Sequence, residues 1–401
     1  MDKSMMDRQD KFLKTLAQTN GTPYLIDVEN AEGIYIYDKK GKQYMDMIAG
    51  VAVNNIGHSH PSVIEAIKSQ VEKHMHVMVY GEYIQDAQLD AAKELLSYLP
   101  ESLNQVYFVN SGTEAAEGAL KLAKRLTGRS EIIAFKGAYH GSTHGALSLA
   151  SNPDKTEKFR PLLPEIKHLT FNSIEDLNNI SNKTAAVVME TIQGDAGVRI
   201  PDQNFMDVLR KRCSETGAQL ILDEIQTGIG RTGKMFAFEH YNVVPDILLL
   251  GKALGGGMNV GAFVSSRDKM KELSQNPILG HITTFGGHPV VCAAVAACLK
   301  AIKDEDILDG VEEKGALLES IVIKNSEVHE IRRKGLMFAI EMESFERVEK
   351  VVKACLEKGL IGFWFLSTPN AFRLSPPLTI TEAQIKEAGK IILEAIEETT
   401  I

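Results

Sequence analysis

Short apolar runs rich in β-branched residues recur along the middle of the chain, and helical patterns separate several of them. The runs predict buried strands at Gln105–Val109, Glu131–Phe135, Ala185–Met189, Gln219–Leu222, Ile247–Leu250 and Gly261–Ser265. Apolar positions at helical spacing predict helices over Glu114–Leu126 and Asn204–Glu215. Strands that are apolar throughout are buried on both faces, so this alternation predicts an α/β fold with a mostly parallel central sheet covered by helices.

The two ends of the chain follow a different pattern. Ile34–Tyr37 and Lys42–Asp46 flank an Asp-Lys-Lys-Gly turn, which predicts a hairpin. Beyond residue 305, charged helical segments alternate with strand-like runs at Met337–Met342 and Leu360–Phe365. We interpret the two ends together as a smaller α+β domain.

The length of 401 residues suits a large domain joined to a smaller one. We predict an N-terminal segment of the small domain at residues 1–55, a large ligand-binding domain at 56–305, and a C-terminal part of the small domain at 306–401.

Composition and charge narrow the possible partners. The chain is 44% hydrophobic and 24% charged, and its net charge of −9 with only short Lys/Arg runs argues against a nucleic-acid partner. The first 20 residues are too polar for a signal peptide, and no apolar run reaches membrane-spanning length. The four cysteines form no CxxC and no metal-binding spacing. We therefore expect a cytoplasmic protein with no membrane partner and no metal site.

Chemistry in such sheets gathers at the carboxyl ends of the strands. After Asn110 the chain reads Ser111-Gly112-Thr113-Glu114, a capping-box pattern whose free N–H groups and positive helix end would bind an anion. Gly112 lets the backbone approach a ligand closely, and Thr113 adds a hydroxyl donor. Taken alone, the pattern is more often a plain helix cap.

The strand ending at Phe135 leads into Ala138-Tyr139-His140-Gly141-Ser142. An aromatic side chain at such an exit lies flat on a planar ligand in many sites. Without further evidence, Tyr139 is more often a core or rim residue and His140 a loop histidine.

Two buried strands end in charged residues. Gln219–Leu222 runs into Asp223, and Ile247–Leu250 into Gly251-Lys252. A buried charge is unfavourable unless an opposite charge meets it, and desolvation lowers the pKa of a lysine. One interpretation is a buried Asp223–Lys252 ion pair. The other is a cofactor between them, with a cationic ring nitrogen for Asp223 and an aldehyde for Lys252.

The stretch from Asp223 to Met235, DEIQTGIGRTGKM, overlaps two nucleotide-binding patterns. Met235 stands where a P-loop needs Ser or Thr for Mg²⁺. A dinucleotide fingerprint opens directly from a strand into a helix, whereas Glu224–Thr227 intervene here and no helical pattern begins at Gly233. We therefore reject both patterns and interpret GIGRTGK as a flexible turn that brings backbone near a ligand held by Asp223.

Together these residues resemble the class III (ω-) aminotransferases, which are fold-type-I enzymes that use pyridoxal 5′-phosphate. The matching motifs, in family order, are SGTEA (from Ser111), YHG (from Tyr139), ETIQG (from Glu190), LILDEIQTGIGRTG, PDILLLGKALGGG, TTFGGHP and RLSPPLTIT. The resemblance extends from about Gly33 to Ile380, and the motifs are jointly very specific.

The resemblance implies a role for each matching residue. Lys252 would form the Schiff base with the cofactor, Asp223 would pair with its pyridine nitrogen, and Arg373 would clamp a substrate carboxylate. Thr284 resembles the threonine that reaches the neighbouring subunit's phosphate, which implies a homodimer with shared active sites. The other implied contacts are Gly112 and Thr113 to the phosphate, Tyr139 on the ring, Gln226 to the ring hydroxyl, His140 and Ile225 around the cofactor, and Glu190 and Asp195 near the substrate.

The chain departs from the family at several positions. Members usually have Glu where Asp195 stands; that carboxylate pairs with the clamp arginine and releases it when an α-carboxylate arrives. We hypothesise that Asp195, one methylene shorter, still pairs with Arg373. Ser142 stands where members that act on ornithine, acylornithine or 4-aminobutyrate commonly have Arg. Val51 lies in a segment that has a tyrosine in ornithine aminotransferases, and that tyrosine is missing here.

The resemblance predicts transfer of a terminal amino group from an ω-amino acid or diamine to 2-oxoglutarate by a ping-pong mechanism. The donor classes are acetylornithine, ornithine, 4-aminobutyrate and putrescine. The segment from His140 to Pro164 is similar to putrescine aminotransferases, whereas AGVAVNNIGH is similar to acetylornithine aminotransferases. A pyridoxal-phosphate-dependent aminomutase or decarboxylase of the same fold, or a non-catalytic cofactor-binding dimer, stays open as an alternative.

Overall fold

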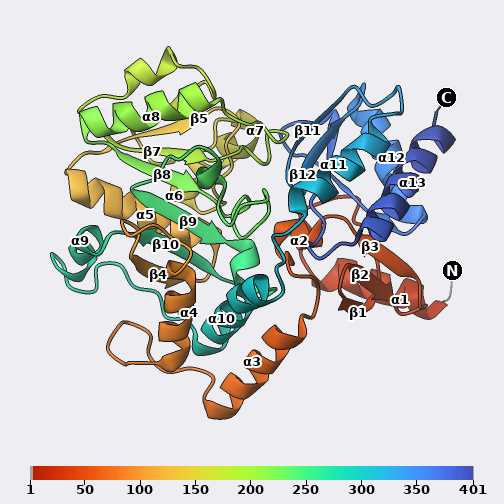
Figure 1. Ribbon diagram of the computed structural model, residues 1–401, viewed down its shortest axis with the longest axis horizontal. Helices are drawn as coiled ribbons and strands as arrows, with labels where there is room; N and C mark the ends of the chain where they lie inside the picture. The colour runs from red at the N-terminus through yellow and green to blue at the C-terminus, as the bar shows by residue number, and fades with distance from the viewer. Residues whose placement is uncertain (1–2, 401) are drawn as a thin grey trace.

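A seven-stranded sheet forms the centre of the computed structural model, which describes residues 3–400 (Figure 1). Its strands, in spatial order, are β4 (Gln105–Val109), β10 (Gly261–Ser265), β9 (Ile247–Gly251), β8 (Gln219–Asp223), β7 (Thr184–Glu190), β5 (Glu131–Phe135) and β6 (Ile166–Leu169). The neighbours from β9 through β6 are parallel, and β10 runs antiparallel to both β9 and β4. The prediction of an α/β fold with a mostly parallel sheet is confirmed.

Apolar side chains on both faces of this sheet are buried. In β8, Leu220 and Leu222 belong to one core cluster while Ile221 belongs to the other, as the twofold repeat of a strand requires. Helix α5 covers the face of Ile221, and α4, α8 and α10 cover the opposite face. This burial explains why most of these strands are nearly continuous apolar runs rather than alternating ones.

The helices are distributed along the whole chain. They are α1 (Lys3–Thr15), α2 (Ala49–Ala52), α3 (Pro61–Lys73), α4 (Asp86–Leu96), α5 (Gly112–Thr127), α6 (His144–Leu147), α7 (Pro153–Thr156), α8 (Gln203–Thr216), α9 (Arg267–Met270), α10 (Pro289–Asp304), α11 (Val311–Val322), α12 (Phe345–Glu357) and α13 (Glu382–Glu398). Short 3₁₀ turns are η1 (Glu157–Phe159), η2 (Asp176–Asn179), η3 (Ala237–His240), η4 (Lys252–Gly255) and η5 (Lys271–Ser274).

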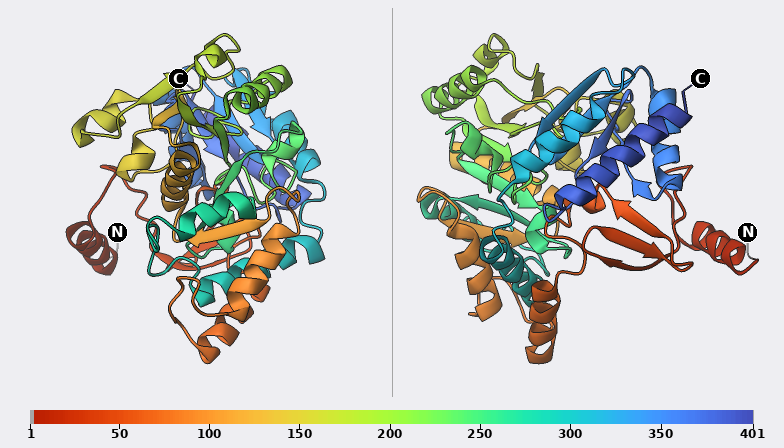
Figure 2. Two further views of the ribbon diagram at one scale, coloured as in Figure 1. Left: turned by 90° about the vertical axis from the view of Figure 1, so that its left-hand side faces the viewer. Right: turned by 45° about the vertical axis from the view of Figure 1, so that its right-hand side comes forward.

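Two four-stranded sheets lie beside the central one, and both chain ends are on this side of the molecule (Figures 1 and 2). The first sheet consists of β1 (Val28–Glu32), β2 (Tyr35–Asp38), β3 (Gln43–Asp46) and β13 (Leu360–Ile361). The second consists of β11 (Glu330–Lys334), β12 (Met337–Glu341), β15 (Ala371–Leu374) and β14 (Phe363–Trp364). The predicted hairpin is β2–β3, and the parallel β3–β13 pair joins the two ends of the chain.

The predicted strand over Leu360–Phe365 is wrong as one element. The run divides at Gly362, because β13 pairs with β3 in the first sheet whereas β14 pairs with β15 in the second. Its apolar pattern reflects burial between two sheets rather than a single ladder. The domain boundaries near residues 55 and 305 stay a prediction.

Within residues 3–400, no helix combines the length and the apolar character that a membrane crossing requires. The four cysteines are buried and carry free thiols. His58 and His60, the nearest approach to a metal-ligand spacing, contact different carboxylates: His58 lies 2.8 Å from Asp46, and His60 lies 3.2 Å from Glu305.

Candidate active site

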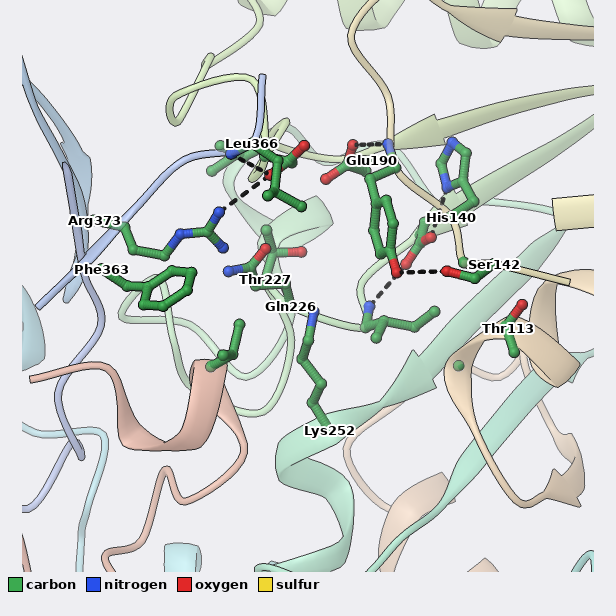
Figure 3. A pocket seen from close by; sticks show the side chains of 18 residues that line it. Thr113, His140, Ser142, Glu190, Gln226, Thr227, Lys252, Phe363, Leu366 and Arg373 are labelled. Carbon is green, nitrogen blue, oxygen red and sulfur yellow. Dashed lines mark hydrogen bonds and ion pairs between the residues drawn. The ribbon is translucent and has the colours of Figure 1, made fainter. Parts of the chain in front are cut away.

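A cavity of about 460 Å³ opens at the carboxyl edge of the central sheet (Figure 3). The strand register places its charged residues there, because Glu190 of β7 is paired with Asp223 of β8, and Asp223 is paired in turn with Leu249 near the end of β9. Lys252 follows β9 directly. Residues that are far apart in the chain therefore converge because parallel strands end at the same edge.

Asp223 is buried, and each of its carboxylate oxygens accepts a hydrogen bond. Oδ2 lies 2.7 Å from His140 Nδ1, and Oδ1 accepts the Ile225 N–H at 2.9 Å. Burial alone would lower the pKa of His140, but the hydrogen bond and charge of Asp223, helped by Glu190, outweigh it and the net pKa is raised. His140 and the Ile225 N–H thus hold the Asp223 carboxylate in a fixed orientation at the cavity wall.

Lys252 extends its side chain into the same cavity (Figure 3). Its backbone has a left-handed φ of 41°, which an L-residue adopts only under constraint. Burial lowers the pKa of the Lys252 ammonium, although the charges of Asp223 and Glu190 oppose that shift. No Asp223–Lys252 ion pair occurs among the described residues, so the simple ion-pair interpretation of the two strand ends is wrong.

The first turn of α5 forms an anion cradle at the cavity wall. Ser111 caps the helix, because its hydroxyl accepts a hydrogen bond from the Glu114 N–H. The reciprocal hydrogen bond differs from the predicted capping box, because the Glu114 carboxylate accepts the N–H of Asn110 rather than that of Ser111. A side chain on Gly112 would approach Ile225 Cδ1 within 2.7 Å, so only glycine leaves the backbone open here. The first N–H groups of a helix lack intrahelical carbonyl partners, so those at the start of α5 are available to an anion.

The hydroxyl of Thr113 is engaged within the chain. It lies 2.7 Å from Thr143 Oγ1 and accepts the Thr143 N–H at 3.2 Å, while Thr143 Oγ1 donates to Glu117. Because the Thr143 hydroxyl donates its hydrogen bond to Glu117, the Thr113 hydroxyl must be the donor in its hydrogen bond with Thr143 Oγ1. We therefore expect the Thr113 backbone N–H, rather than its hydroxyl, to face an anion in this arrangement.

Tyr139 and Glu190 form the wall next to His140. Tyr139 is 40% exposed, so its ring has a free surface at the cavity, and its hydroxyl lies 3.2 Å from Ser142 Oγ. Glu190 accepts the N–H groups of Tyr139 and Gly194 at 3.0 and 2.8 Å. Burial raises the pKa of the Glu190 carboxyl to about 7, despite the nearby His140. Glu190 therefore fixes two loops that border the cavity.

Arg373 and Asp195 form the ion pair hypothesised from the sequence, with Arg373 Nη2 3.1 Å from Asp195 Oδ1. The Arg373 guanidinium lies 4.5 Å from the Phe365 ring centroid, and its buried Nε has no hydrogen-bond partner within the described chain. Burial would raise the pKa of Asp195, but Lys155, Ser367 and Arg373 together hold it below its usual value. A buried guanidinium with unused donors is ready to bind a carboxylate.

Lys155 was not expected from the sequence. It lies on the four-residue helix α7 and contacts Asp195 Oδ2 at 2.8 Å. A lone lysine in a polar loop carries no sequence signal, so only the folding of α7 against the cavity reveals it.

Val51 also lines the cavity, and its backbone is unusual. The turn Ala49–Ala52 has a positive φ at every residue, with 66° at Val51, which is unfavourable for a β-branched side chain. Asp46 supports this turn by accepting the N–H groups of Ile48 and Gly50. The strained turn places Val51 against the ligand space.

Of the other predicted site residues, Ile225 and Gln226 line the cavity, whereas Thr284 is exposed and does not line the cavity of its own chain. The prediction that GIGRTGK is a flexible turn beside the ligand is wrong. Residues 228–232 are buried, Lys234 is exposed, and none of the segment lines the cavity. Arg231 donates to the carbonyls of Leu336 and Pro376. Its glycines allow close packing against the C-terminal segment instead.

The donor set fits a planar ring with a cationic nitrogen and a phosphate. Asp223 supplies the negative charge, the first turn of α5 supplies an anion cradle, and Lys252 supplies an amine between them. The space opposite, at Arg373, suits a carboxylate. These residues fit pyridoxal 5′-phosphate with a carboxylate-bearing substrate next to it.

Comparisons with known proteins agree with this geometry. The model of the family described as Aminotransferase class-III matches residues 16–396. The chain is 41% identical to an acetylornithine aminotransferase of Methanopyrus kandleri, over 91% of this chain and 92% of that protein. It is 39% identical to a [LysW]-aminoadipate semialdehyde/glutamate semialdehyde transaminase of Sulfolobus acidocaldarius, over 92% and 95% of the two chains. The crystal structure of ornithine aminotransferase from Toxoplasma gondii superposes with a TM-score of 0.91 at 29% identity, over 99% and 96% of the chains.

Proposed function

This chain belongs to the class III aminotransferases, which depend on pyridoxal 5′-phosphate, and from that premise we propose that it moves a terminal amino group from an ω-amino acid or diamine to 2-oxoglutarate. The observation that carries the proposal is the buried Arg373–Asp195 pair in the same cavity as Lys252. A cation that is already neutralised by the protein can change partners. One cavity can then accept a donor without a carboxylate near Arg373 and an acceptor that has one.

Pyridoxal 5′-phosphate supplies an aldehyde and an electron-accepting ring when it is bound. We propose that Asp223 holds the ring nitrogen in its protonated form, because the buried carboxylate and His140 are fixed against each other at 2.7 Å. The N–H groups of Gly112 and Thr113, at the positive end of α5, would hold the phosphate. Tyr139 and Gln226 complete the ring site from the loops that follow β5 and β8.

Lys252 has two roles in this proposal: its Nζ would bind the aldehyde carbon of the cofactor, and as a neutral amine it would move a proton at the donor carbon. The lowered pKa of Lys252 favours the neutral amine, which is the form that accepts a proton. Lys252 Nζ then takes the proton from the amine-bearing carbon of the donor. This role is supported by the position of Lys252 at the end of β9, in the same cavity as Asp223 and Arg373 (Figure 3).

The donor class rests on the relatives and on two wall residues. An acetylornithine aminotransferase and a semialdehyde transaminase are the relatives described above, so we propose an ω-amino donor of similar size. Ser142 provides a hydroxyl rather than a cation beside Tyr139, which disfavours a second donor carboxylate at that point. Putrescine, which has no carboxylate, is therefore a proposed donor together with ornithine and acetylornithine.

We propose that the enzyme is a homodimer. Thr284 is exposed in its own chain, and large apolar side chains are exposed nearby in sequence and on the α3–α4 connection: Met75, Tyr83, Ile84, Ile278 and Phe285. A partner that covers this surface would bring Thr284 to the phosphate of the neighbouring cavity. Mixing Lys252→Ala with Thr284→Ala tests the arrangement, because only a mixed dimer with shared sites regains one intact site.

The test of the function is a panel of amines added separately to the purified holoenzyme. Putrescine, ornithine, N-acetylornithine, lysine and 4-aminobutyrate are each compared by the absorbance of the bound cofactor, which changes as the aldehyde form becomes the amine form. Addition of 2-oxoglutarate should restore the original spectrum and yield glutamate. Release of CO₂ or an isomerised donor, with no glutamate, would replace this proposal by decarboxylation or amine migration.

A further inference from the structure

Asp195 is held by more groups than a simple switch between Arg373 and a substrate requires. Its Oδ1 accepts from Arg373 Nη2 at 3.1 Å and from the Leu366 N–H at 3.3 Å. Its Oδ2 accepts from Lys155 Nζ at 2.8 Å and from Ser367 Oγ at 2.7 Å. The oxygen that meets Arg373 is therefore different from the oxygen that meets Lys155, and losing Arg373 leaves three of these four contacts in place.

Arg373 is the more loosely held member of the pair. Asp195 is its hydrogen-bonding partner through one nitrogen, at 3.1 Å, and the buried Nε has no partner within residues 3–400. The Arg373 guanidinium also lies over the Phe365 ring, 4.5 Å from its centroid. An incoming carboxylate can thus offer Arg373 two hydrogen bonds in place of one.

Charge balance shows why the lysine matters. A substrate carboxylate that takes Arg373 leaves Asp195 behind, and a buried carboxylate without a cation is strongly unfavourable. Lys155 stays within 2.8 Å of Asp195 and keeps it neutralised. Lys155 and Arg373 carry two positive charges and Asp195 carries one negative charge, so the group has a net charge of +1 that a substrate carboxylate would neutralise.

We propose that Lys155 is a positioning residue for the use of two substrates: it keeps Asp195 in place, so that Arg373 changes partners while Asp195 stays still. This inference rests on the proposed aminotransferase function. It differs from a switch in which the protein carboxylate moves away, because Lys155 and Ser367 hold Oδ2, the oxygen of Asp195 that does not meet Arg373.

The test compares Lys155→Met with wild type in the holoenzyme, using glutarate, a dicarboxylate that cannot react. Without Lys155, Arg373 is the one cation left in contact with Asp195 among the described residues, so Asp195 competes more strongly with the ligand for Arg373. We expect the glutarate Kd, measured by calorimetry, and the KM for 2-oxoglutarate to rise about tenfold or more. The KM for a diamine donor without a carboxylate should stay within about twofold.

Three further variants define the cause. Lys155→Arg keeps the cation and should retain glutarate binding, and Lys158→Met makes the same change at an exposed lysine nearby and should have no effect. In an Asp195→Asn background no carboxylate needs neutralising, so adding Lys155→Met should change the glutarate Kd by less than about twofold. This non-additivity separates an action through Asp195 from direct ligand binding by Lys155.

The inference is overturned if Lys155→Met binds glutarate like wild type, or if it loses as much affinity in the Asp195→Asn background as it does when Asp195 is present. An equal loss for glutarate and for the diamine would also overturn it, because that result indicates general damage to the cavity. Failure of the proposed function has a different signature: wild-type holoenzyme would then transfer no amino group from any donor.

Discussion

Asp223→Asn removes one negative charge from the cavity while keeping the shape of the side chain. In the native site both oxygens of Asp223 accept hydrogen bonds, from Ile225 N–H at 2.9 Å and from His140 Nδ1 at 2.7 Å. An asparagine has only one acceptor oxygen. If that oxygen keeps the Ile225 N–H, the amide NH₂ faces His140, whose proton must then move to Nε2, which is buried without a partner in the described chain.

The expected effect follows from these contacts. A hydrogen bond to a charged partner contributes about 1.5–3 kcal/mol, so loss of the charge opposite a cationic ring nitrogen should weaken cofactor binding by about 10- to 150-fold. A buried Nε2–H without a partner adds about 1–3 kcal/mol of destabilisation to the cavity itself. The pKa of His140 should also fall below its ordinary value, because burial lowers it and the opposing effect of Asp223 is gone.

The assay titrates cofactor-free protein with pyridoxal 5′-phosphate and follows absorbance and tryptophan fluorescence. Asp246→Asn is the matched control, since Asp246 is a similarly salt-bridged carboxylate just before the amino end of β9, where it meets Arg210 and Lys269. That change should affect stability and leave the cofactor Kd unchanged. A cofactor Kd within about twofold of wild type for Asp223→Asn would refute the assignment of Asp223 to the ring nitrogen.

Three other predictions concern neighbouring groups. Lys252→Ala should abolish turnover while the phosphate site retains some cofactor; near-normal kcat would remove Lys252 from the mechanism. Burial raises the pKa of Glu190 from 4.5 to about 7, so the folded state binds more protons than the unfolded state between these values, and wild-type stability falls as pH rises through that window. Glu190→Gln, which does not titrate, should therefore gain up to about 3 kcal/mol relative to wild type between pH 4.5 and 7.5 in denaturant unfolding, and a pH-independent difference would contradict the burial argument. Gly141→Ala would put a Cβ 2.3 Å from Thr113 Oγ1 at a φ of +129° and should weaken cofactor binding. The control Gly128→Ala, at a φ of +65° in open space, should reduce stability alone. Equal cofactor affinities of the two variants would show that Thr113 is not part of the cradle.

The features of the protein that depend on local pattern could be predicted from the amino-acid sequence. Apolar runs of strand length fixed the position of β4, β5, β7, β8, β9 and β10, because a doubly covered sheet needs apolar residues at every position. The charged residues after those strands marked the cavity, since a buried strand ends in Asp223 or Lys252 only where something compensates the charge. The motifs and their order then indicated the family.

Tertiary structure alone decided the features that depend on residues distant in sequence. His140 pairs with Asp223, and Lys155 with Asp195, across separations of 83 and 40 residues that no local pattern encodes. The run after Gly359 belongs to two sheets, because β13 pairs with β3 and β14 pairs with β15. The GIGRTGK segment packs against the C-terminal part of the chain, where Arg231 donates hydrogen bonds to the carbonyls of Leu336 and Pro376. Hydrophobic periodicity predicts which face of a strand or helix is buried. Which charged side chains pair in the interior depends on how whole helices and strands pack, and this packing arises only in the folded chain.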